Sequence, residues 1–218
     1  MDLLALNQKI LTKRRQYGDR EFLESTMAEN PFIQFASWFE DVLSIDDLDP
    51  CAMVLSTIDE SGFPDSRVVL LLGLKDNKFI FYTSYASVKA QQMLNNNKVA
   101  VNFYWAELSR QVRIQGVVEK ITPQENQLYF ATRDRGGQLA AYSVIQSSPI
   151  KDRDSLVQQY KIAEEAFQNQ EITCPENWGG YAITPVKYEF FQGRNSRLHD
   201  RMVYSLVNGK WQIQRIAP

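Results

Sequence analysis

The chain has 218 residues, of which 44% are hydrophobic and 23% are charged, and its formal net charge is −2. These totals fit one substantial domain with its own core, or such a domain with a helical appendage. The near-balanced charge excludes a protein that holds nucleic acid by a strongly basic surface, so any phosphate binding must be local. The first residues lack the pattern of a signal peptide, and no long uninterrupted apolar run is present, so we expect a cytoplasmic protein without membrane contact.

The N-terminal residues have the pattern of helices. In the segment 3–17 apolar residues recur at helical spacing, and Gly18 is a suitable stop. Asn30 can cap a second helix, whose apolar residues also recur on one face. We therefore predict a helical segment over residues 1–45, followed by a domain of different architecture over residues 46–218.

From residue 51 the pattern changes to short strands. Three strands are predicted from apolar stretches that turn clusters separate, namely CAMVLSTI, RVVLLLGL and KFIFYTS, with DESGFP and KDNK between them. The stretch SVKAQQMLNNN predicts a short helix, which Ser84 or Ser87 would cap. KVAVNFYW and RQVRIQGVVEKI predict two more strands, and in the second Val112, Ile114 and then Val117 alternate with polar residues.

The remaining elements are helices followed by strands. Pro123 can open a helix that runs through Tyr129 to Arg133, RGGQLAAYSVIQSS is a loop with a small-residue helix, and RDSLVQQYKIAEEAFQNQ is an amphipathic helix. Further strands follow, and the NG dipeptide at 208–209 predicts a hairpin. Six to eight strands in meander order with short helices between them predict an α+β fold, mainly β, built on a closed or partly closed antiparallel barrel. The βαβ rhythm of a parallel nucleotide-binding sheet is absent.

Several common chemical motifs are missing from the sequence. No GxGxxG or GxxxxGK[ST] motif offers a phosphate cradle. The chain has one histidine, His199, and two distant cysteines, Cys51 and Cys174, so we expect neither a metal site nor a disulfide framework. A Ser-His-Asp hydrolase is not favoured, because no GxSxG elbow is present and arginines flank the histidine.

Cationic side chains at the ends of elements are the candidate anion sites. Arg67, expected to open a strand, and Lys89, in the first turn of a helix, could grip one phosphate together. Tyr129 and Arg133 are one helical turn apart and could both reach another phosphate. By themselves such charges are more often part of the solvated surface.

A third cationic group lies near the C-terminus. Arg197, His199 and Arg201 alternate along a segment that we expect to be extended, so their side chains would point the same way.

A series of motifs runs in one order through nearly the whole chain. The most specific are RQVRIQG at 110–116, WGGY at 178–181 and RLHDR at 197–201, and RRQY, RVVLL, SVKA, YFATR and RIAP accompany them. In this order the chain resembles the pyridoxine/pyridoxamine 5′-phosphate oxidase family. The resemblance implies a split β-barrel and a homodimer, with residues 178–218 in the barrel and at the interface, and with FMN bound between the subunits. It also implies oxidation of pyridoxine 5′-phosphate or pyridoxamine 5′-phosphate to pyridoxal 5′-phosphate, with O2 as acceptor and H2O2 released.

The resemblance also implies roles for individual residues. Substrate binding would fall to Arg14, Tyr17, Tyr129, Arg133, Arg197 and His199, of which Arg197 and His199 would be catalytic. FMN contacts would fall to Arg67, Val68, Leu70, Leu71, Tyr82, Thr83, Lys89, Gln111, Gln146, Ser147, Phe191 and Arg201. Residues 1–45 would carry Arg14 and Tyr17 as a lid over the site. A neutral His199 would accept a hydrogen bond from the substrate, and its flanking cations would help to keep it neutral.

The chain departs from the family pattern at four positions. Leu72 replaces a lysine and Gly137 a serine that would hold the substrate phosphate, while Val88 replaces an arginine near the FMN phosphate and Phe191 replaces a tryptophan. Arg135 is the nearest cation in sequence that could compensate. Two other hypotheses stay open: a flavin-dependent oxidase of the phenazine-biosynthesis type, and a non-catalytic protein that binds FMN or pyridoxal phosphate.

Overall fold

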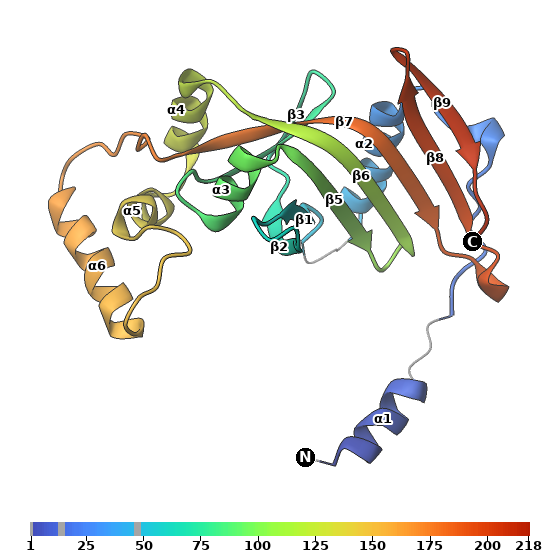
Figure 1. Cartoon of the computed structure of the whole chain (residues 1–218), viewed down its shortest axis with the longest axis horizontal. Helices are drawn as coiled ribbons and strands as arrows, with labels where there is room; N and C mark the ends of the chain where they lie inside the picture. Colours follow the sequence, from blue (N-terminus) through green and yellow to red (C-terminus); the bar gives the residue numbers. More distant parts are fainter. Residues whose placement is uncertain (1, 13–15, 46–48) are drawn as a thin grey trace. The chain divides into compact units, whose positions relative to one another are not determined.

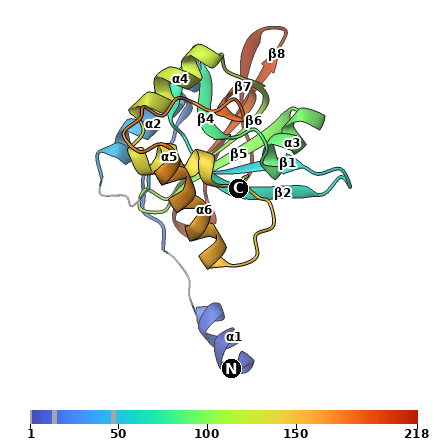
Figure 2. The same cartoon turned by 90° about the vertical axis from the view of Figure 1, so that its left-hand side faces the viewer.

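The computed structural model describes residues 2–12, 16–45 and 49–218 (Figures 1 and 2). The helices are α1 (Leu3–Thr12), α2 (Pro31–Leu43), α3 (Val88–Asn95), α4 (Pro123–Thr132), α5 (Arg135–Ser143) and α6 (Arg153–Ala166), with short 3₁₀ turns at Glu24–Thr26 and Asn195–Arg197. The strands are β1 (Ala52–Ile58), β2 (Pro64–Leu70), β3 (Gly73–Lys75), β4 (Lys78–Ser84), β5 (Lys98–Trp105), β6 (Arg110–Lys120), β7 (Trp178–Gln192), β8 (Asp200–Val207) and β9 (Lys210–Arg215). Within these described ranges no helix has both the length and the apolar character to cross a membrane.

The chain forms two compact units. Unit 1 contains residues 1–47, 104–112 and 189–218, and unit 2 contains residues 48–103 and 113–188. In unit 2, helices α5 and α6 lie side by side in both views (Figures 1 and 2). The division into residues 1–45 and 46–218 expected from the sequence stays a prediction.

The order of the strands differs from the predicted meander. The described residues form nine strands rather than six to eight, in the order β2-β1-β5-β6-β7-β4-β3, with β8 beside β7 and β9. The late strand β7 pairs with the early strand β4, and this pairing places Tyr82 opposite Gly180. Alternation along one strand shows which face is buried but does not identify its neighbours, so the sequence did not predict this order.

Two-residue turns close the β3–β4 hairpin and the β8–β9 hairpin. Asp76 and Asn77 have φ values of 51° and 60° between β3 and β4, and Asn208 and Gly209 have φ values of 50° and 76° between β8 and β9. Positive φ at both central residues is typical of a type I′ turn, which matches the twist of antiparallel strands. The hairpin predicted at the NG dipeptide is confirmed.

Two details of the predicted strands are wrong. Arg67 lies inside β2, which already begins at Pro64, and not at the start of a strand. In β6 the buried face continues from Ile114 to Gly116 and Val118, whereas Val117 is exposed. A Cβ at Gly116 would lie 2.6 Å from the carbonyl oxygen of Thr184. Glycine therefore occupies an inward-facing position of β6 where the backbones of β6 and β7 lie too close for a larger side chain.

Unit 1 is built around aromatic packing on α2. The predicted cap is confirmed, because Asn30 Oδ1 accepts a hydrogen bond of 2.9 Å from the Phe32 N–H. On the buried face of α2, the Trp38 ring lies 4.8 Å from that of Phe22 and 5.2 Å from that of Phe190. These contacts anchor the segment before α2 against β7.

The first helix is shorter than predicted. It ends at Thr12, whose hydroxyl donates to the carbonyls of Gln8 and Lys9, and Tyr17 lies outside any helix. The Tyr17 ring lies edge-on to the ring of His199, with centroids 5.0 Å apart. This tertiary contact outweighs the helical periodicity of the segment.

A capping box fixes the start of α4, the helix that carries Tyr129. Thr122 Oγ1 accepts a hydrogen bond from the Glu125 N–H at 3.2 Å, and the Glu125 carboxylate accepts one from the Thr122 N–H at 3.0 Å. We expect Thr122→Ala to lower the free energy of unfolding by about 1 kcal/mol, measured by chemical denaturation. Thr122→Ser keeps the acceptor oxygen and should change it by less than about 0.5 kcal/mol. An equal loss in both variants would contradict a capping role.

Candidate functional site

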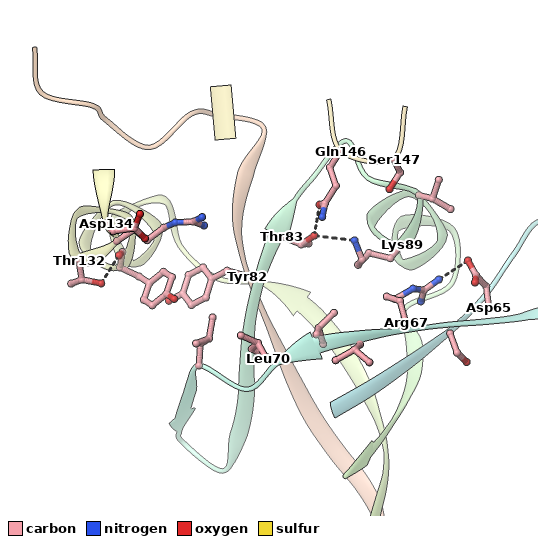
Figure 3. A pocket seen from close by; sticks show the side chains of 17 residues that line it. Asp65, Arg67, Leu70, Tyr82, Thr83, Lys89, Thr132, Asp134, Gln146 and Ser147 are labelled. Atoms are coloured by element: carbon pink, nitrogen blue, oxygen red, sulfur yellow. Dashed lines mark hydrogen bonds and ion pairs between the residues drawn. The ribbon is translucent and has the colours of Figure 1, made fainter. Parts of the chain in front are cut away.

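A cavity of about 940 Å3 lies in unit 2. It is walled by β2, β4, the start of α3, the end of α4 and the loop after α5 (Figure 3). Figure 3 shows two groups of polar side chains, with Arg67, Lys89 and Thr83 on one side and Tyr82 and Thr132 on the other. We call these the cationic end and the ring end of the cavity.

Arg67 is held in place at the cationic end. Its guanidinium donates to Thr57 Oγ1 at 2.6 Å and to Gln92 Oε1 at 3.1 Å, and it pairs with the Asp65 carboxylate at 2.5 Å. Thr57 and Gln92 are buried and hydrogen-bond each other at 2.5 Å, so the support is rigid. The Gln92 hydrogen bond and the Arg67 charge lower the pKa of Asp65, which therefore stays ionised.

Lys89 supplies the second cation from the first turn of α3. Its ammonium is buried and donates to Thr83 Oγ1 at 3.2 Å. Burial, followed by the nearby Arg67 charge, lowers the pKa of Lys89, and an anion placed between the two cations would offset both effects.

The start of α3 offers further donors to an anion. The first N–H groups of a helix have no intrahelical partner. The hydroxyl of Ser87, the N-cap residue, is fully buried and has no hydrogen-bond partner within the described part of the chain, and it does not cap the helix through its side chain. A buried hydroxyl without a partner at a cationic helix start fits a site for a phosphate group, so the residues present suit the phosphate of FMN.

A chain of hydrogen bonds links α3, β4 and the loop after α5 at the cavity wall. Thr83 Oγ1, which accepts from Lys89, donates in turn to Gln146 Oε1 at 2.9 Å. The same Gln146 oxygen accepts from the Ser84 N–H at 3.3 Å. The next residue, Ser147, has φ 73°, so the loop turns sharply at the cavity wall. Thr83 and Gln146 are therefore linked by hydrogen bonds, and together with Ser147 they line this side of the cavity.

Stacked rings form the other end of the cavity. The rings of Tyr82 and Tyr129 are 3.8 Å apart and nearly parallel, and Trp178 stacks on Tyr82 at 5.5 Å. The Arg133 guanidinium lies 4.6 Å from the centre of the Trp178 ring. Burial, followed by the proximity of Tyr129, raises the pKa of Tyr82 to about 12, so its hydroxyl stays protonated. Arg133 is the one cation among the residues that line this end of the cavity.

The backbone of Gly137 positions Arg133. The guanidinium donates to the Gly137 carbonyl at 2.9 Å, and Asp134 caps α5 by accepting from the Gly137 N–H. A Cβ at residue 137 would lie 3.0 Å from Arg133 Nη2 and 3.0 Å from Asp134 Oδ1. The serine expected at this position would therefore crowd Arg133, and glycine allows the guanidinium its present place.

Apolar side chains are exposed along the cavity wall. Val68, Leu70, Leu72 and Val88 are 64%, 42%, 41% and 48% exposed. Apolar surface grouped beside polar and cationic groups is typical of a wall that a flat ligand or a partner covers.

The predicted site residues divide between the two units. The cavity in unit 2 brings together Arg67, Val68, Leu70, Tyr82, Thr83, Lys89, Tyr129, Arg133, Gln146 and Ser147. The Leu71 side chain is buried outside the cavity lining, so a ligand contact there would have to use main-chain atoms. Arg135 donates to the carbonyls of Phe167 and Gln170 and does not line the cavity. Arg14 lies outside the described residues.

The other predicted residues lie in unit 1. Tyr17 and Phe191 flank the His199 ring, with centroids 5.0 and 4.8 Å from it. Arg201 pairs with Glu189 at 2.6 Å. Gln111 is half-buried on β6.

The segment that carries Arg197 and His199 is not extended as predicted. Ser196 and Arg197 both have left-handed φ values, 56° and 60°, and a 3₁₀ turn covers Asn195–Arg197. Arg201, in contrast, lies in β8. Because the backbone turns at Ser196 and Arg197 and becomes a strand only from Asp200, simple alternation does not describe how these three side chains are arranged.

Some lining residues were missed from the sequence. They are Asp65, Ser66, Val69, Thr132 and Asp134. Asp134 had a usable signal, because an aspartate directly before a helix is a favoured N-cap. Thr57 and Gln92, which support Arg67 from behind, had none, because each meets its partner from a distant part of the chain. Trp178 opens the WGGY motif, but the sequence did not show its contact with Arg133.

Two family models match the sequence. The model described as pyridoxamine 5′-phosphate oxidase matches residues 46–165, and the model described as pyridoxine 5′-phosphate oxidase C-terminal dimerisation region matches residues 178–218. The pyridoxine/pyridoxamine 5′-phosphate oxidase of Legionella pneumophila (strain Paris) is 46% identical over 205 residues, which cover 94% of this chain and 95% of the relative. The relative of the same name from Synechocystis sp. is 43% identical over 94% of this chain and 96% of its own length.

Solved structures share the fold. PhzG from Burkholderia lata 383, in complex with tetrahydrophenazine-1-carboxylic acid, matches with a TM-score of 0.86 at 23% identity and covers 92% of this chain and 99% of its own. An FMN-binding protein related to pyridoxamine 5′-phosphate oxidase, from Nostoc punctiforme, matches with a TM-score of 0.72 at 18% identity, over 88% of this chain and 100% of its own. The α+β split-barrel fold predicted from the sequence is confirmed.

Proposed function

Because the chain belongs to the pyridoxine/pyridoxamine 5′-phosphate oxidase family and is thus an oxidoreductase, we propose that it oxidises pyridoxine 5′-phosphate or pyridoxamine 5′-phosphate to pyridoxal 5′-phosphate. The electrons pass to FMN and then to O2, which leaves as H2O2. The observation that supports this best is a single cavity with a cation pair at one end and the Tyr129–Arg133 pair at the other. The match of residues 178–218 to a dimerisation region supports a homodimer.

FMN would use the cationic end of the cavity. Arg67, Lys89 and the start of α3 would hold its phosphate, and the polar wall of Thr83 and Gln146 would hydrogen-bond the flavin. The exposed apolar wall, including Val68, would lie against the rest of the cofactor. When bound, the flavin supplies the hydride acceptor. The protein therefore has to bind the flavin and the substrate, orient one against the other and tune the electronic properties of the flavin.

The substrate phosphate would use the ring end. Arg133 can pair with it and Tyr129 can donate a hydrogen bond, while Trp178 and Gly137 keep the guanidinium in position. Arg197 and His199 are proposed to contact the pyridine ring and the carbon that loses hydride. Arg14 and Tyr17 are proposed to cover the substrate. Such anchoring would place the reacting carbon at near-attack distance from the acceptor.

A spectroscopic experiment tests the function. The purified protein reconstituted with FMN should show a flavin absorption band, and anaerobic addition of pyridoxine 5′-phosphate or pyridoxamine 5′-phosphate should bleach it while pyridoxal 5′-phosphate forms. Admitting air should then restore the band with formation of H2O2. A protein that takes up FMN but is not bleached would overturn the oxidase proposal and leave the non-catalytic alternative. Bleaching by a phenazine precursor but not by either vitamer would favour the phenazine-type alternative.

Leu72 is expected to limit the affinity for the substrate phosphate. It lines the cavity with an apolar side chain where a cation would add a charge-assisted hydrogen bond. We therefore expect Leu72→Lys to lower KM for pyridoxine 5′-phosphate by about tenfold, measured in steady-state assays. Leu72→Met, of similar length without charge, should leave KM unchanged. An unchanged or raised KM in Leu72→Lys would mean that other groups already satisfy the phosphate.

A further inference from the structure

We propose that the main chain of Arg194 holds His199 as the Nε2–H tautomer, so that the imidazole offers the substrate a hydrogen-bond donor and not an acceptor. The identity of the substrate in this inference rests on the proposed function, whereas the assignment of the tautomer does not depend on it. It reverses the acceptor role that the sequence suggested for the histidine.

The assignment follows from one hydrogen bond. The backbone N–H of Arg194 donates to Nδ1 of His199 at 2.9 Å. A neutral imidazole has one protonated nitrogen and one lone-pair nitrogen, and Nδ1 must carry the lone pair to accept from an amide. The proton is therefore on Nε2, which has no protein partner within the described part of the chain and remains available to a ligand.

Protonation of His199 would break this arrangement. In the imidazolium form Nδ1 also carries a proton, which would face the Arg194 N–H, donor against donor. The surroundings already oppose protonation, because burial and then the charges of Arg197 and Arg201 lower the pKa of His199. The side chains that pack against the His199 ring are those of Tyr17 and Phe191, and neither of them is negatively charged.

The Arg194 amide is itself rigidly placed. The preceding Gly193 N–H donates to the Ser109 carbonyl at 2.7 Å. The Arg194 side chain contacts the Asp200 carboxylate at 3.4 Å and pairs with Glu21 at 3.1 Å. Asp200, which is buried, also accepts from Arg215 at 2.6 Å. These bonds fasten both ends of the loop that contains the histidine.

The loop backbone then brings the ring back to this amide. The consecutive left-handed residues Ser196 and Arg197 reverse the chain, and the Leu198 N–H closes the turn on the Asn195 carbonyl at 3.2 Å. Left-handed φ in two non-glycine residues carries a conformational cost that surrounding contacts must offset. The return of His199 Nδ1 to Arg194 is one such contact. The loop therefore selects both the position of the imidazole and its tautomer.

The chemical consequence concerns the atom that faces His199. An Nε2–H donor can hydrogen-bond a substrate atom with a lone pair, such as a hydroxyl oxygen or an uncharged amine nitrogen, and it cannot take a proton from that atom. Arg194 is thus a positioning residue that acts through its backbone, and His199 orients the substrate.

The tautomer can be observed directly, because His199 is the one histidine in the chain. Protein labelled with 15N-histidine gives a single imidazole spin system, and long-range 1H–15N spectra separate protonated from lone-pair nitrogens. At neutral pH we expect Nδ1 at the lone-pair position and Nε2 at the protonated position, with or without FMN. The reverse assignment, or two averaged nitrogens, would overturn the proposal. Neither outcome depends on turnover, so a failed oxidase assay would not affect it.

A pair of amide variants tests the donor role. His199→Gln can place an amide N–H near the Nε2 position, whereas His199→Asn can accept from Arg194 but has no donor that reaches as far. If Nε2–H donates to the substrate, kcat/KM of the glutamine variant should exceed that of the asparagine variant by about tenfold. Equal loss in both variants, at equal FMN content, would mean that His199 acts by another route.

Discussion

Arg67→Met is expected to raise the dissociation constant for FMN by roughly ten- to hundredfold, because a charge-assisted hydrogen bond to the phosphate contributes about 1.5 to 3 kcal/mol. Arg67 is presented to the cavity by Thr57 and Gln92, so little entropy is lost when it binds an anion. Its charge is partly offset by Asp65, and Lys89 forms no ion pair among the described residues, so the two cations together leave an excess positive charge for the phosphate. Quenching of FMN fluorescence on titration into apoprotein measures the constant.

Two controls sharpen this prediction. Arg67→Lys keeps the charge but not the forked geometry, and it should lie between wild type and Arg67→Met. Arg153→Met removes an exposed arginine from α6, outside the cavity lining, and should leave FMN affinity unchanged. If Arg67→Met bound FMN as tightly as wild type, the cofactor phosphate would have to lie elsewhere.

Much of the fold follows from local patterns. The alternation in KVAVNFYW predicted β5 to the residue, and the NG dipeptide predicted the hairpin between β8 and β9. At the cationic end, Lys89 was recognised because the first turn of a helix favours anions irrespective of tertiary contacts. Such features are visible in sequence because their causes lie within a few residues.

Other features depend on distant partners and were not predictable. The buried pair that supports Arg67 joins Thr57 to Gln92, and Trp178 reaches Arg133 from the start of β7. The reversal at Ser196 had no glycine to signal it. The role of His199 changed for the same reason, because its tautomer depends on a backbone amide that no sequence pattern marks.

Arg133→Met is expected to raise KM for pyridoxine 5′-phosphate by up to about a hundredfold and to leave the dissociation constant for FMN near the wild-type value. The reason is that Arg133 is the one cation lining the ring end of the cavity, and Leu72, which is part of the same lining, contributes no charge. Steady-state kinetics and an FMN titration on the same preparation measure the two effects. Thermal unfolding should be checked alongside, because the guanidinium also packs on Trp178.

The two ends of the cavity are tested against each other by combining variants. If Leu72→Lys places its ammonium on the substrate phosphate, adding it to Arg133→Met should recover about tenfold in KM, because one charge-assisted bond replaces another. Arg67→Met combined with Leu72→Lys should show no such recovery of FMN affinity, because Leu72 and Arg67 would serve different phosphates. A raised FMN dissociation constant in Arg133→Met, with KM unchanged, would show that the assignment of the two ends is reversed. The cation pair would then hold the substrate, and the single guanidinium beside the stacked rings would hold the cofactor.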